Sequence, residues 1–337
     1  MRSRSIVLHR LVRFAGLACL PALAAGAIAA AVAAEPPRAI SVVARPVALD
    51  IADAERTRVG KLRYRGGVSL TSSDGRFGGW SDLWLDRDGR HLVAISDRGF
   101  WLEAKLTFDW SGAPSGLDEA RLGGLIDLDG RPITGFAADA EALVRLPDGG
   151  FLVAFERRHR IWHYPSAEPP FSIAPTNIPP PPELSRAPPN GGLEALARLS
   201  DGRLFALAEE LVVEGANVGW IGDGKTWRTL GYVAAADYKP TSASELPDGD
   251  VLVLERRYTR RDGPGARLVR LARRDIEPGA RLVGEELARI EPPLTIDNFE
   301  GVVAWRESDG TTRIYIISDD NYSLLQRTLL LAFDLVK

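Results

Sequence analysis

The sequence predicts an all-β fold, and within that class a β-propeller made of four-stranded antiparallel blades. From Glu35 onward there is no long amphipathic helical pattern. Short apolar runs rich in Val, Leu, Phe and Trp alternate with Asp-Gly or Pro-Asp-Gly turns, which is typical of β-hairpins. These hairpins resemble one another and recur about every fifty residues, which is the spacing of propeller blades. A β-sandwich whose hairpins match by chance is the alternative, and the number of matching copies weighs against it.

Five copies of the hairpin are visible, and each follows one plan. A first strand opens with an acidic residue, a turn containing Asp-Gly follows, and a second strand ends on an acidic residue. Thr241 takes the opening place in the fourth copy, and the opening acids of the others are Asp82, Glu141, Glu194 and Glu300. The closing acids are Asp97, Glu156, Glu209, Glu255 and Asp319. Most copies are followed by enough residues for two more strands, which completes a four-stranded blade.

The two ends of the propeller domain bear on the number of blades, which is five or six. The last copy is followed by a single further strand, 328–335, and so lacks a fourth strand. The segment 40–70 has strand-like runs, and it either supplies that missing strand or helps to build a sixth blade. The proline-rich segment 169–189 is interpreted as an extended loop between the second and third blades. We therefore expect one propeller domain, 35–337.

Residues 1–34 have the charge and hydrophobicity order of a secretory signal peptide. Arginines but no acids lie in residues 1–13, an uncharged stretch rich in Ala and Leu covers 14–34, and Ala31-Val32-Ala33 fits a cleavage site. We expect a cleaved Sec-type signal, a periplasmic or secreted protein, and no membrane span in the mature chain. A retained membrane anchor is the alternative. The single cysteine, Cys19, lies in this segment, so the mature protein has no thiol.

Composition and motif content exclude several classes of function. The formal net charge of −3 gives no basic excess for nucleic-acid binding. One cysteine rules out a disulfide framework and a multi-cysteine zinc site. The sequence has no Gly-x-Ser-x-Gly elbow, no His-Glu-x-x-His zinc motif and no dinucleotide-binding glycine fingerprint. The sequence does not indicate an oligomeric state.

The repeated acids are expected to meet at one mouth of the propeller. In a blade the first strand is innermost and the second runs antiparallel to it, so the start of the first lies beside the end of the second. Up to nine carboxylates then gather near the axis on one face. Like charges at this density raise one another's pKa, so they need compensation.

Two kinds of group can compensate these carboxylates. Arg98, Arg157 and Arg256 each directly follow a closing acid. A calcium ion is the second, because calcium takes several carboxylate and carbonyl oxygens, and Asn298 and Asn321 would add neutral ones. Acid–arginine pairs that only hold neighbouring blades together are the alternative interpretation.

Four parts of the chain resemble a bacterial phytase-like family, known as the "esterase-like activity of phytase" group. They are 81–85 with 94–101 (AISDRGFW), 139–157 (DAEALVRLPDGGFLVAFER), 191–210 (GGLEALARLSDGRLFALAEE), and 297–321 (DNFEGVVAW through IYIISDDN). The resemblance covers nearly the whole mature chain. It implies an exported propeller related in architecture to the calcium-dependent alkaline phytases, and a hydrolase of phosphoesters or other esters.

The resemblance to calcium phytases also implies roles for the repeated residues. Calcium would be held by Asp82, Asp97, Glu141, Glu194, Glu255, Glu300 and Asp319. Phosphate oxygens would be bound by Arg98, Arg157 and Arg256, and Glu156 or Glu209 would act as general acid–base. The expected substrate is a small-molecule phosphomonoester or other ester. Calcium phytases place several lysines at the phosphate whereas this chain has few, which weighs against phytate.

Two other classes of function stay open. A calcium-dependent lactonase or arylesterase propeller would hydrolyse neutral esters and would not need the three arginines. A non-catalytic periplasmic binding propeller would pair its acids with arginines and bind no metal. Calcium binding, together with turnover of a phosphate ester and an acetate ester, distinguishes the three classes.

Overall fold

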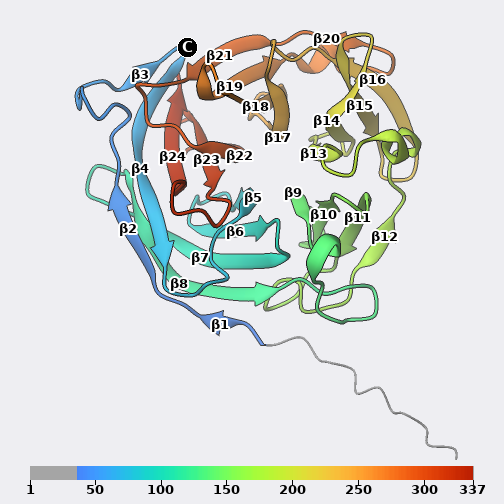
Figure 1. Cartoon of the computed structure of the whole chain (residues 1–337), viewed down its shortest axis with the longest axis horizontal. Helices are drawn as coiled ribbons and strands as arrows, with labels where there is room; N and C mark the ends of the chain where they lie inside the picture. The colour runs from blue at the N-terminus through green and yellow to red at the C-terminus, as the bar shows by residue number, and fades with distance from the viewer. Residues whose placement is uncertain (1–35, 337) are drawn as a thin grey trace, which may run out of the picture. The chain divides into compact units, whose positions relative to one another are not determined.

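The computed structural model describes residues 36–336, and in it five sheets stand around a common axis (Figure 1). This arrangement is a five-bladed β-propeller. It confirms the predicted all-β fold class, and the number of blades is five, not six. In every blade the first strand is innermost, and the second and third follow outward in chain order.

Blades are numbered along the chain and described from the innermost strand outward. Blade 1 contains β5 (Trp80–Leu85), β6 (His91–Ser96), β7 (Phe100–Phe108), β8 (Pro114–Gly124) and β1 (Arg38–Ala39). Blade 2 contains β9 (Ala140–Arg145), β10 (Phe151–Phe155), β11 (Arg160–Tyr164) and β12 (Thr176–Ile178). Blade 3 contains β13 (Leu193–Arg198), β14 (Leu204–Val213), β15 (Ala216–Gly222), β16 (Trp227–Tyr232) and β20 (Arg281–Leu282).

The last two blades complete the ring. Blade 4 contains β17 (Lys239–Glu245), β18 (Val251–Thr259), β19 (Gly263–Leu271) and β21 (Glu285–Ile290). Blade 5 contains β22 (Asn298–Arg306), β23 (Thr312–Asp319), β24 (Thr328–Leu335), β4 (Leu62–Ser72) and β2 (Val42–Pro46), with β3 (Arg58–Val59) paired to β4. Three short 3-10 helices lie in connections: η1 (Gly135–Ala137), η2 (Pro182–Arg186) and η3 (Arg273–Asp275).

Blade 5 joins the two ends of the propeller domain. Its first three strands come from the C-terminal part of the chain, and β4 and β2 from the N-terminal part add the fourth and fifth. β4 pairs antiparallel with β24 from Leu70 opposite Thr328 to Leu62 opposite Leu335. The segment 40–70 therefore supplies the missing fourth strand, and the alternative of a sixth blade is wrong.

The proline-rich segment after blade 2 does more than connect blades. It was expected to be an extended loop, but within it Thr176–Ile178 forms β12, the outermost strand of blade 2. Proline lacks a backbone N–H, so prolines are tolerated beside a short edge strand that needs a partner on one side only. Apolar spacing alone does not reveal a three-residue edge strand of this kind.

The hydrophobic core is divided among the five interfaces between blades. Five clusters of buried apolar side chains are found, and each packs strands of one blade against the next. Trp80, Trp101 and Trp220 are among the largest fully buried side chains. The inner strands are apolar on both faces because each blade is covered on both sides by its neighbours. This packing holds the inner strands, and therefore the axial residues, in fixed positions.

The turns and the repeated acids lie at opposite ends of the inner strands, and therefore at opposite mouths of the propeller. The Asp-Gly turns connect the first and second strands; at Gly149 and Gly249 the backbone φ is 84° and 92°, in the left-handed region that glycine tolerates. The repeated acids lie at the other ends of the same strands. Short turns and acidic mouth therefore belong to opposite faces of the ring.

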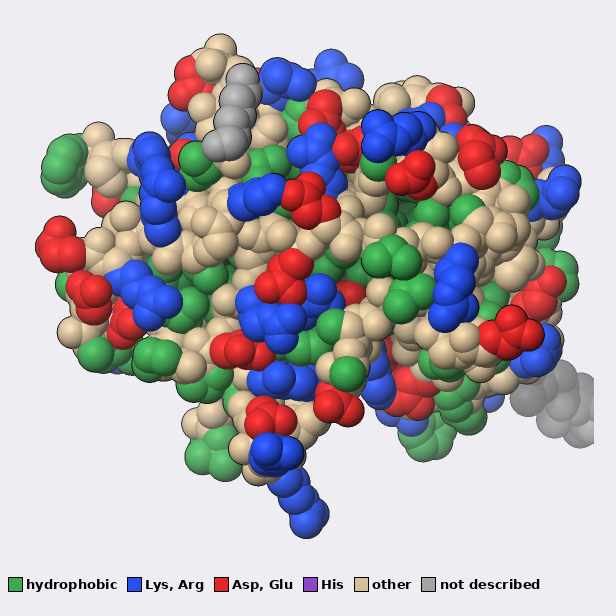
Figure 2. All heavy atoms as spheres, turned by 90° about the horizontal axis from the view of Figure 1, so that it is seen from above, with side chains coloured by type: hydrophobic (Ala, Val, Ile, Leu, Met, Phe, Trp, Pro, Cys, Tyr) green, Lys and Arg blue, Asp and Glu red, His purple; other side chains and the backbone are tan. Residues whose placement is uncertain are grey.

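The face of the molecule drawn in Figure 2 has no dominant charge. On the face drawn in Figure 2, Lys and Arg side chains are interspersed with Asp and Glu side chains. Within residues 36–336 we find no helix with the length and hydrophobicity needed to span a bilayer. The predicted signal peptide, 1–34, lies outside the described residues.

Candidate functional site

Every innermost strand contains a β-bulge near the acidic mouth. In each blade the register between the first and second strands shifts by one residue, which leaves one residue of the first strand without a partner. These unpaired residues are Ser81, Glu141, Glu194, Thr241 and Glu300. A bulge changes the direction of a side chain, so the same position is re-aimed in all five blades.

The second strands contribute the position beside each bulge. Following the register from the turn, this position holds Asp97, Glu156, Glu209, Arg256 and Asp319. We call these five residues and the five bulge residues the axial ring. The predicted meeting of opening and closing positions on one face is confirmed by the register, and the carboxylates of blades 2, 3 and 5 are close enough to raise one another's pKa.

Glu255 does not belong to the axial ring, contrary to the sequence alignment. It pairs with Pro240, one residue before the ring position, so its side chain points to the other face of the blade. There it is fully buried, accepts a hydrogen bond from the Tyr232 hydroxyl at 2.5 Å, and forms an ion pair with Arg267. Burial raises the pKa of Glu255, although Tyr232 and Arg267 oppose the shift. Arg256 takes the ring position instead.

Asp82 also lies outside the axial ring, one residue beyond the bulge of blade 1. Its Oδ1 accepts hydrogen bonds from the Leu83 amide at 2.9 Å and the Ser242 hydroxyl at 3.1 Å, and its Oδ2 from the Leu143 amide at 2.8 Å. The Ser242 hydroxyl in turn accepts from the Val302 amide at 3.1 Å. Asp82 therefore connects blades 1, 2, 4 and 5 through hydrogen bonds. Burial raises its pKa to about 8, against the effect of these bonds.

Arg256 compensates the acids on one side of the axial ring. Its guanidinium donates to Glu209 Oε1 at 3.1 Å and to Asn298 Oδ1 at 2.8 Å, and Nε lies 3.3 Å from Glu300 Oε1. Asn298, a predicted ligand, donates its own amide to Glu300 Oε1 at 2.8 Å. Burial lowers the pKa of Arg256, but the surrounding carboxylates raise it more, so it stays charged. Arg256 thus bridges blades 3, 4 and 5.

The carboxylates of blade 2 form a tighter group with no arginine at its centre. Asp139, Glu141 and Glu156 each offer an oxygen, and these three oxygens lie within 4.8 Å of one another. Glu156 is buried, and its Oε1 accepts the backbone N–H groups of Gly191 at 2.8 Å and of Gly192. Asp139 was missed as a candidate because it precedes the repeated opening position. The signal available was a second acid two residues before Glu141.

The three predicted arginines are divided between two places. Arg98 and Arg157 follow ring acids as expected and line the same cavity, whereas Arg256 takes a ring position itself and is not among the residues that line that cavity. Arg157 donates through Nε to Asp139 and through Nη2 to Asn190 Oδ1 at 3.0 Å. The guanidinium carbon of Arg98 lies 3.4 Å from the centre of the Tyr322 ring, a cation–π contact.

The remaining predicted ligands lie on blade 5. Asp319 is buried in the axial ring, and its Oδ1 accepts the Asn321 amide at 2.6 Å. Burial raises the pKa of Asp319 to about 8, and Asp97 and Glu300 add to the shift. Asn321 contributes this backbone amide, with its own φ at 47°. Its backbone therefore tightens the loop that carries Asp319.

Burial and crowding raise the pKa values of six ring acids: Asp97, Glu141, Glu156, Glu194, Glu300 and Asp319. Burial is the main cause for these six, and like charges add to it for Glu141 and Glu194, whose pKa values lie well above the usual range. The pKa is raised to about 7 for Glu156 and Glu300 and to about 6 for Asp97. The ring therefore gathers more carboxyl groups than Arg256 can compensate when they are ionised, and a bound cation would favour their ionisation.

These shifts predict that the cation-free protein loses stability as pH rises. A carboxyl whose pKa is raised by folding holds its proton in the folded state after the unfolded chain has released it, so unfolding becomes easier with rising pH. From about pH 5 to about pH 8 the midpoint of thermal unfolding in EDTA should fall, since the raised pKa values lie between about 6 and about 8. Thermal melts across this range check it. A midpoint that stays level or rises would contradict the crowded ring.

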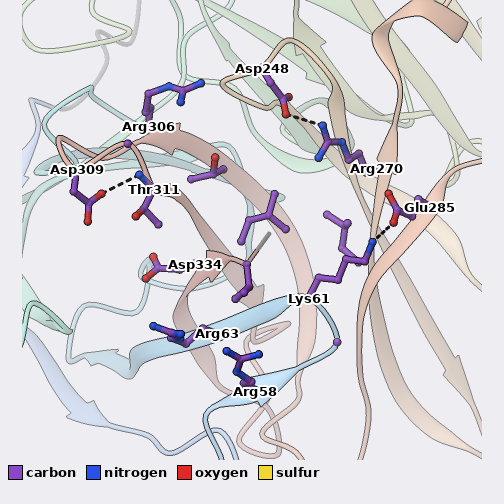
Figure 3. Close-up of a pocket in the computed structure, with 16 residues that line it drawn as sticks. Arg58, Lys61, Arg63, Asp248, Arg270, Glu285, Arg306, Asp309, Thr311 and Asp334 are labelled. Atoms are coloured by element: carbon purple, nitrogen blue, oxygen red, sulfur yellow. Dashed lines mark hydrogen bonds and ion pairs between the residues drawn. The ribbon is translucent and has the colours of Figure 1, made fainter.

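A cavity of about 840 Å³ opens beside the blade 2 carboxylates. Asp97 and Asp139 line it, together with Arg98 and Arg157. A second cavity, of about 940 Å³, lies at the opposite ends of the strands of blades 4 and 5 (Figure 3). In that second cavity Arg270 pairs with Asp248 at 2.6 Å and Lys61 pairs with Glu285, and none of the predicted site residues is present. The first cavity is therefore the one connected to the axial ring.

These features define a class: a five-bladed propeller with clustered carboxylates at its axial mouth and an arginine-lined cavity beside them. The sequence model of the Phytase-like family, described as esterase-like activity of phytase, matches residues 75–322. The chain belongs to this family, which confirms the resemblance. Family and fold together support a hydrolase-type propeller.

Several solved structures are similar to the chain at low sequence identity. An α-L-arabinofuranosidase from Podospora anserina is similar with a TM-score of 0.53 and 15% identity, over 82% of this chain and 97% of that chain. A virginiamycin B lyase variant from Staphylococcus aureus has a TM-score of 0.41 and 9% identity, over 86% and 99%. A glucose dehydrogenase has a TM-score of 0.41 and 13% identity, over 80% and 98%. No curated protein matches the chain. The likeness to the arabinofuranosidase concerns the fold alone.

Proposed function

We propose that this protein is an exported, calcium-dependent hydrolase of phosphomonoesters or other small esters that acts where the axial ring meets the adjoining cavity. The observation that carries the proposal is the group of three carboxylates, Asp139, Glu141 and Glu156, beside a cavity lined by arginines. Export rests on the sequence pattern of residues 1–34.

The donor set fits a hard divalent cation. Calcium binds oxygen at about 2.3–2.6 Å, so two oxygens on one ion lie at most about 5 Å apart. The 4.8 Å limit among the oxygens of Asp139, Glu141 and Glu156 agrees with this requirement. All three are carboxylates, which calcium prefers over nitrogen or sulfur ligands, and Glu194 lies near enough to influence the group. We therefore assign Asp139, Glu141 and Glu156 as the principal ligands.

The chain's own residues would bind and orient the substrate. Arg98 and Arg157 would donate to the anionic oxygens of the ester, because a guanidinium presents paired donors. Arg157 also fixes Asp139, and the amides of Gly191 and Gly192 fix Glu156. When bound, calcium would supply positive charge at the ester and make water more acidic.

We assign the general acid–base role to Asp97 in place of Glu156 or Glu209, the residues suggested by the sequence. Glu156 belongs to the cation group, and Glu209 is held by Arg256 at 3.1 Å. Asp97 lines the cavity, and its buried Oδ1 has no hydrogen-bond partner in the described part of the chain. That oxygen can accept a proton from water or return it to a leaving group without first breaking another bond.

Calcium titration with turnover assays tests the proposal. For the protein 35–337, we expect saturable heat of calcium binding, a raised unfolding midpoint, and hydrolysis of p-nitrophenyl phosphate that EDTA abolishes and calcium restores. Acetate turnover without phosphate turnover would favour a lactonase or arylesterase type of hydrolase instead. An absence of both calcium binding and turnover would contradict the proposal.

A non-catalytic binding propeller is the second candidate. The contacts of Arg256 with Glu209 and Glu300 favour it, because they pair ring acids between blades without a metal. Such pairing would have to extend to the carboxylates of blade 2 to make a cation unnecessary. There Arg157 forms an ion pair with Asp139 but with neither Glu141 nor Glu156, so these two acids have no arginine partner among residues 36–336.

A further inference from the structure

The lining of the cavity beside the axial ring combines cationic and apolar side chains. The cavity is formed where the connection between β8 and β9, which includes η1, passes over the mouth of blades 1 and 2. Arg76, Arg98 and Arg157 contribute cationic groups to this lining, and Phe100, Ile133 and Phe136 contribute apolar ones. At about 840 Å³ the cavity has the size of a site for a small organic molecule.

Among the three arginines that line the cavity, Arg98 is the one best placed to bind an anion. Within the described residues it makes no ion pair, and its guanidinium rests against the Tyr322 ring at 3.4 Å. Stacking of this kind orients a guanidinium but leaves its N–H donors unused. Arg157, by contrast, already donates to Asp139 and Asn190. One anionic group of a ligand can therefore be held by Arg98 with help from its neighbours.

Phe136 contributes an exposed aromatic ring to the cavity lining. Its side chain is 73% exposed, and it extends from η1 directly after Gly135, where φ is 60°. The guanidinium of Arg157 lies 5.1 Å from its ring centre, at one edge of the cavity. Covering an exposed aromatic ring at a concave surface with an apolar ligand group removes apolar surface from water and is therefore favourable.

The acids on the inner side of the cavity limit the charge of the ligand. Asp97 and Asp139 line the cavity next to the axial ring. A ligand with phosphates around its whole surface would place some of them against these carboxylates and others against Phe136. A ligand with one anionic end and one apolar end meets a complementary surface at each end.

We infer that the cavity selects esters that combine a single anionic group with an aromatic or other bulky apolar group, in preference to polyphosphorylated polyols. Arg98 would hold the anionic group, and Phe136 would cover the apolar group. This substrate class rests on the proposed function, because hydrolysis is assigned to the carboxylates that adjoin the same cavity.

Binding of non-hydrolysable phosphonates tests the inference separately from turnover. By titration calorimetry in calcium buffer, phenylphosphonate should bind the parent protein at least about 10-fold more tightly than methylphosphonate, since both share the anion and differ in the ring. Fructose 1,6-bisphosphate, a polyol with two phosphates, should compete more weakly than phenylphosphonate. Equal affinities for the two phosphonates, or tighter binding of the bisphosphate, would overturn the inference.

Matched variants locate the effect. Phe136→Ala should reduce the preference for phenylphosphonate to less than about 3-fold, and Trp110→Ala, which removes another exposed aromatic from the β7–β8 turn, should leave it unchanged. Arg98→Gln should weaken both phosphonates alike. If the preference for phenylphosphonate survives Phe136→Ala, Phe136 does not cover the apolar group of the ligand. Phenylphosphonate binding without turnover of phenyl phosphate would support the inference and contradict the proposed function, and turnover without aryl preference would do the reverse.

Discussion

Glu141→Gln is expected to abolish detectable calcium binding and to lower ester turnover by about 100-fold or more, without lowering the stability of the cation-free protein. Glutamine keeps the size of the side chain but removes its negative charge and one of its two oxygen ligands. Glu141 lies in the group of three oxygens within 4.8 Å, and burial together with nearby carboxylates raises its pKa. Removing that charge relieves repulsion, so the unfolding midpoint in EDTA should stay level or rise.

The same substitution at Glu255 is the matched control. Glu255 lies one residue from the ring position and is buried against Tyr232 and Arg267. Glu255→Gln should lower the unfolding midpoint, because it removes one partner of a buried ion pair. Calcium affinity should stay within about twofold of the parent value, because the ring ligands are intact. Calorimetry measures the calcium affinity of both variants, and thermal melts measure their unfolding midpoints.

Opposite outcomes for the two variants would support the register described above. If Glu141→Gln binds calcium with the parent affinity, the three carboxylates are not the cation site. If Glu255→Gln loses calcium while keeping its stability, the register that removes Glu255 from the ring is not the one the molecule uses in solution.

Asp82→Ala is expected to lower the free energy of unfolding by about 2–4 kcal/mol. The carboxylate accepts hydrogen bonds from the Leu143 amide of blade 2 and the Ser242 hydroxyl of blade 4, and both donors are buried. Without Asp82 they would lack that partner, and a buried unsatisfied donor is costly. Calcium affinity should stay nearly unchanged, since Asp82 is not in the axial ring. Urea unfolding followed by circular dichroism measures the loss.

Ser81→Ala controls for any change at this point of blade 1. Ser81 is the neighbouring bulge residue, and removing its hydroxyl should cost less than about 1 kcal/mol. Asp82→Asn adds a pH test. The pKa of Asp82 is about 8, so its ionisation in the folded state is one source of the loss of stability at higher pH, and that loss should become smaller in the variant. A destabilisation by Asp82→Ala no greater than that by Ser81→Ala would contradict its bridging role.

Most of the fold could be predicted because short sequence signals recur in every blade. Asp-Gly turns, apolar strands and a spacing of about fifty residues identify the blades without any long-range information. The role of β4 could be narrowed to two alternatives but not decided, because pairing between Leu70 and Thr328 depends on the closed ring. The strand 176–178 could not be predicted, since three residues beside prolines carry no periodic pattern.

The sequence could place the repeated acids at one mouth, but aligning residues by type assigned Glu255 to the position that Arg256 takes. Seven residues separate Gly149 from Glu156 and Gly202 from Glu209, and the same distance from Gly249 ends on Arg256, not on Glu255. Counting from the turns of blades 2 and 3 would have placed Arg256 in the ring, although Asp97 lies eight positions after Gly89 and Asp319 nine positions after Gly310. The bulges make counting from the other side unreliable, because each inserts one residue before the strand resumes its pairing.

Asp82 illustrates the same limit from the opposite direction. Its neighbour Ser81 is the residue that the bulge directs to the mouth, so the acid falls one step further along the strand. Only the partners that approach from other blades, Leu143 and Ser242, show that this carboxylate joins blades. Such partners are distant in sequence and have no local signature.

The closure of blade 5 has a consequence for how the chain folds while it is being made. β4 ends at Ser72, and its inner neighbour β24 begins at Thr328. At about 5–20 residues per second, a ribosome needs on the order of 13–50 s to cover that distance. For that interval the nascent β4 has an exposed edge that invites pairing with other chains. Arg63 and Arg65 interrupt the apolar residues of this strand, and charges of this kind act as gatekeepers against aggregation until the final strand emerges.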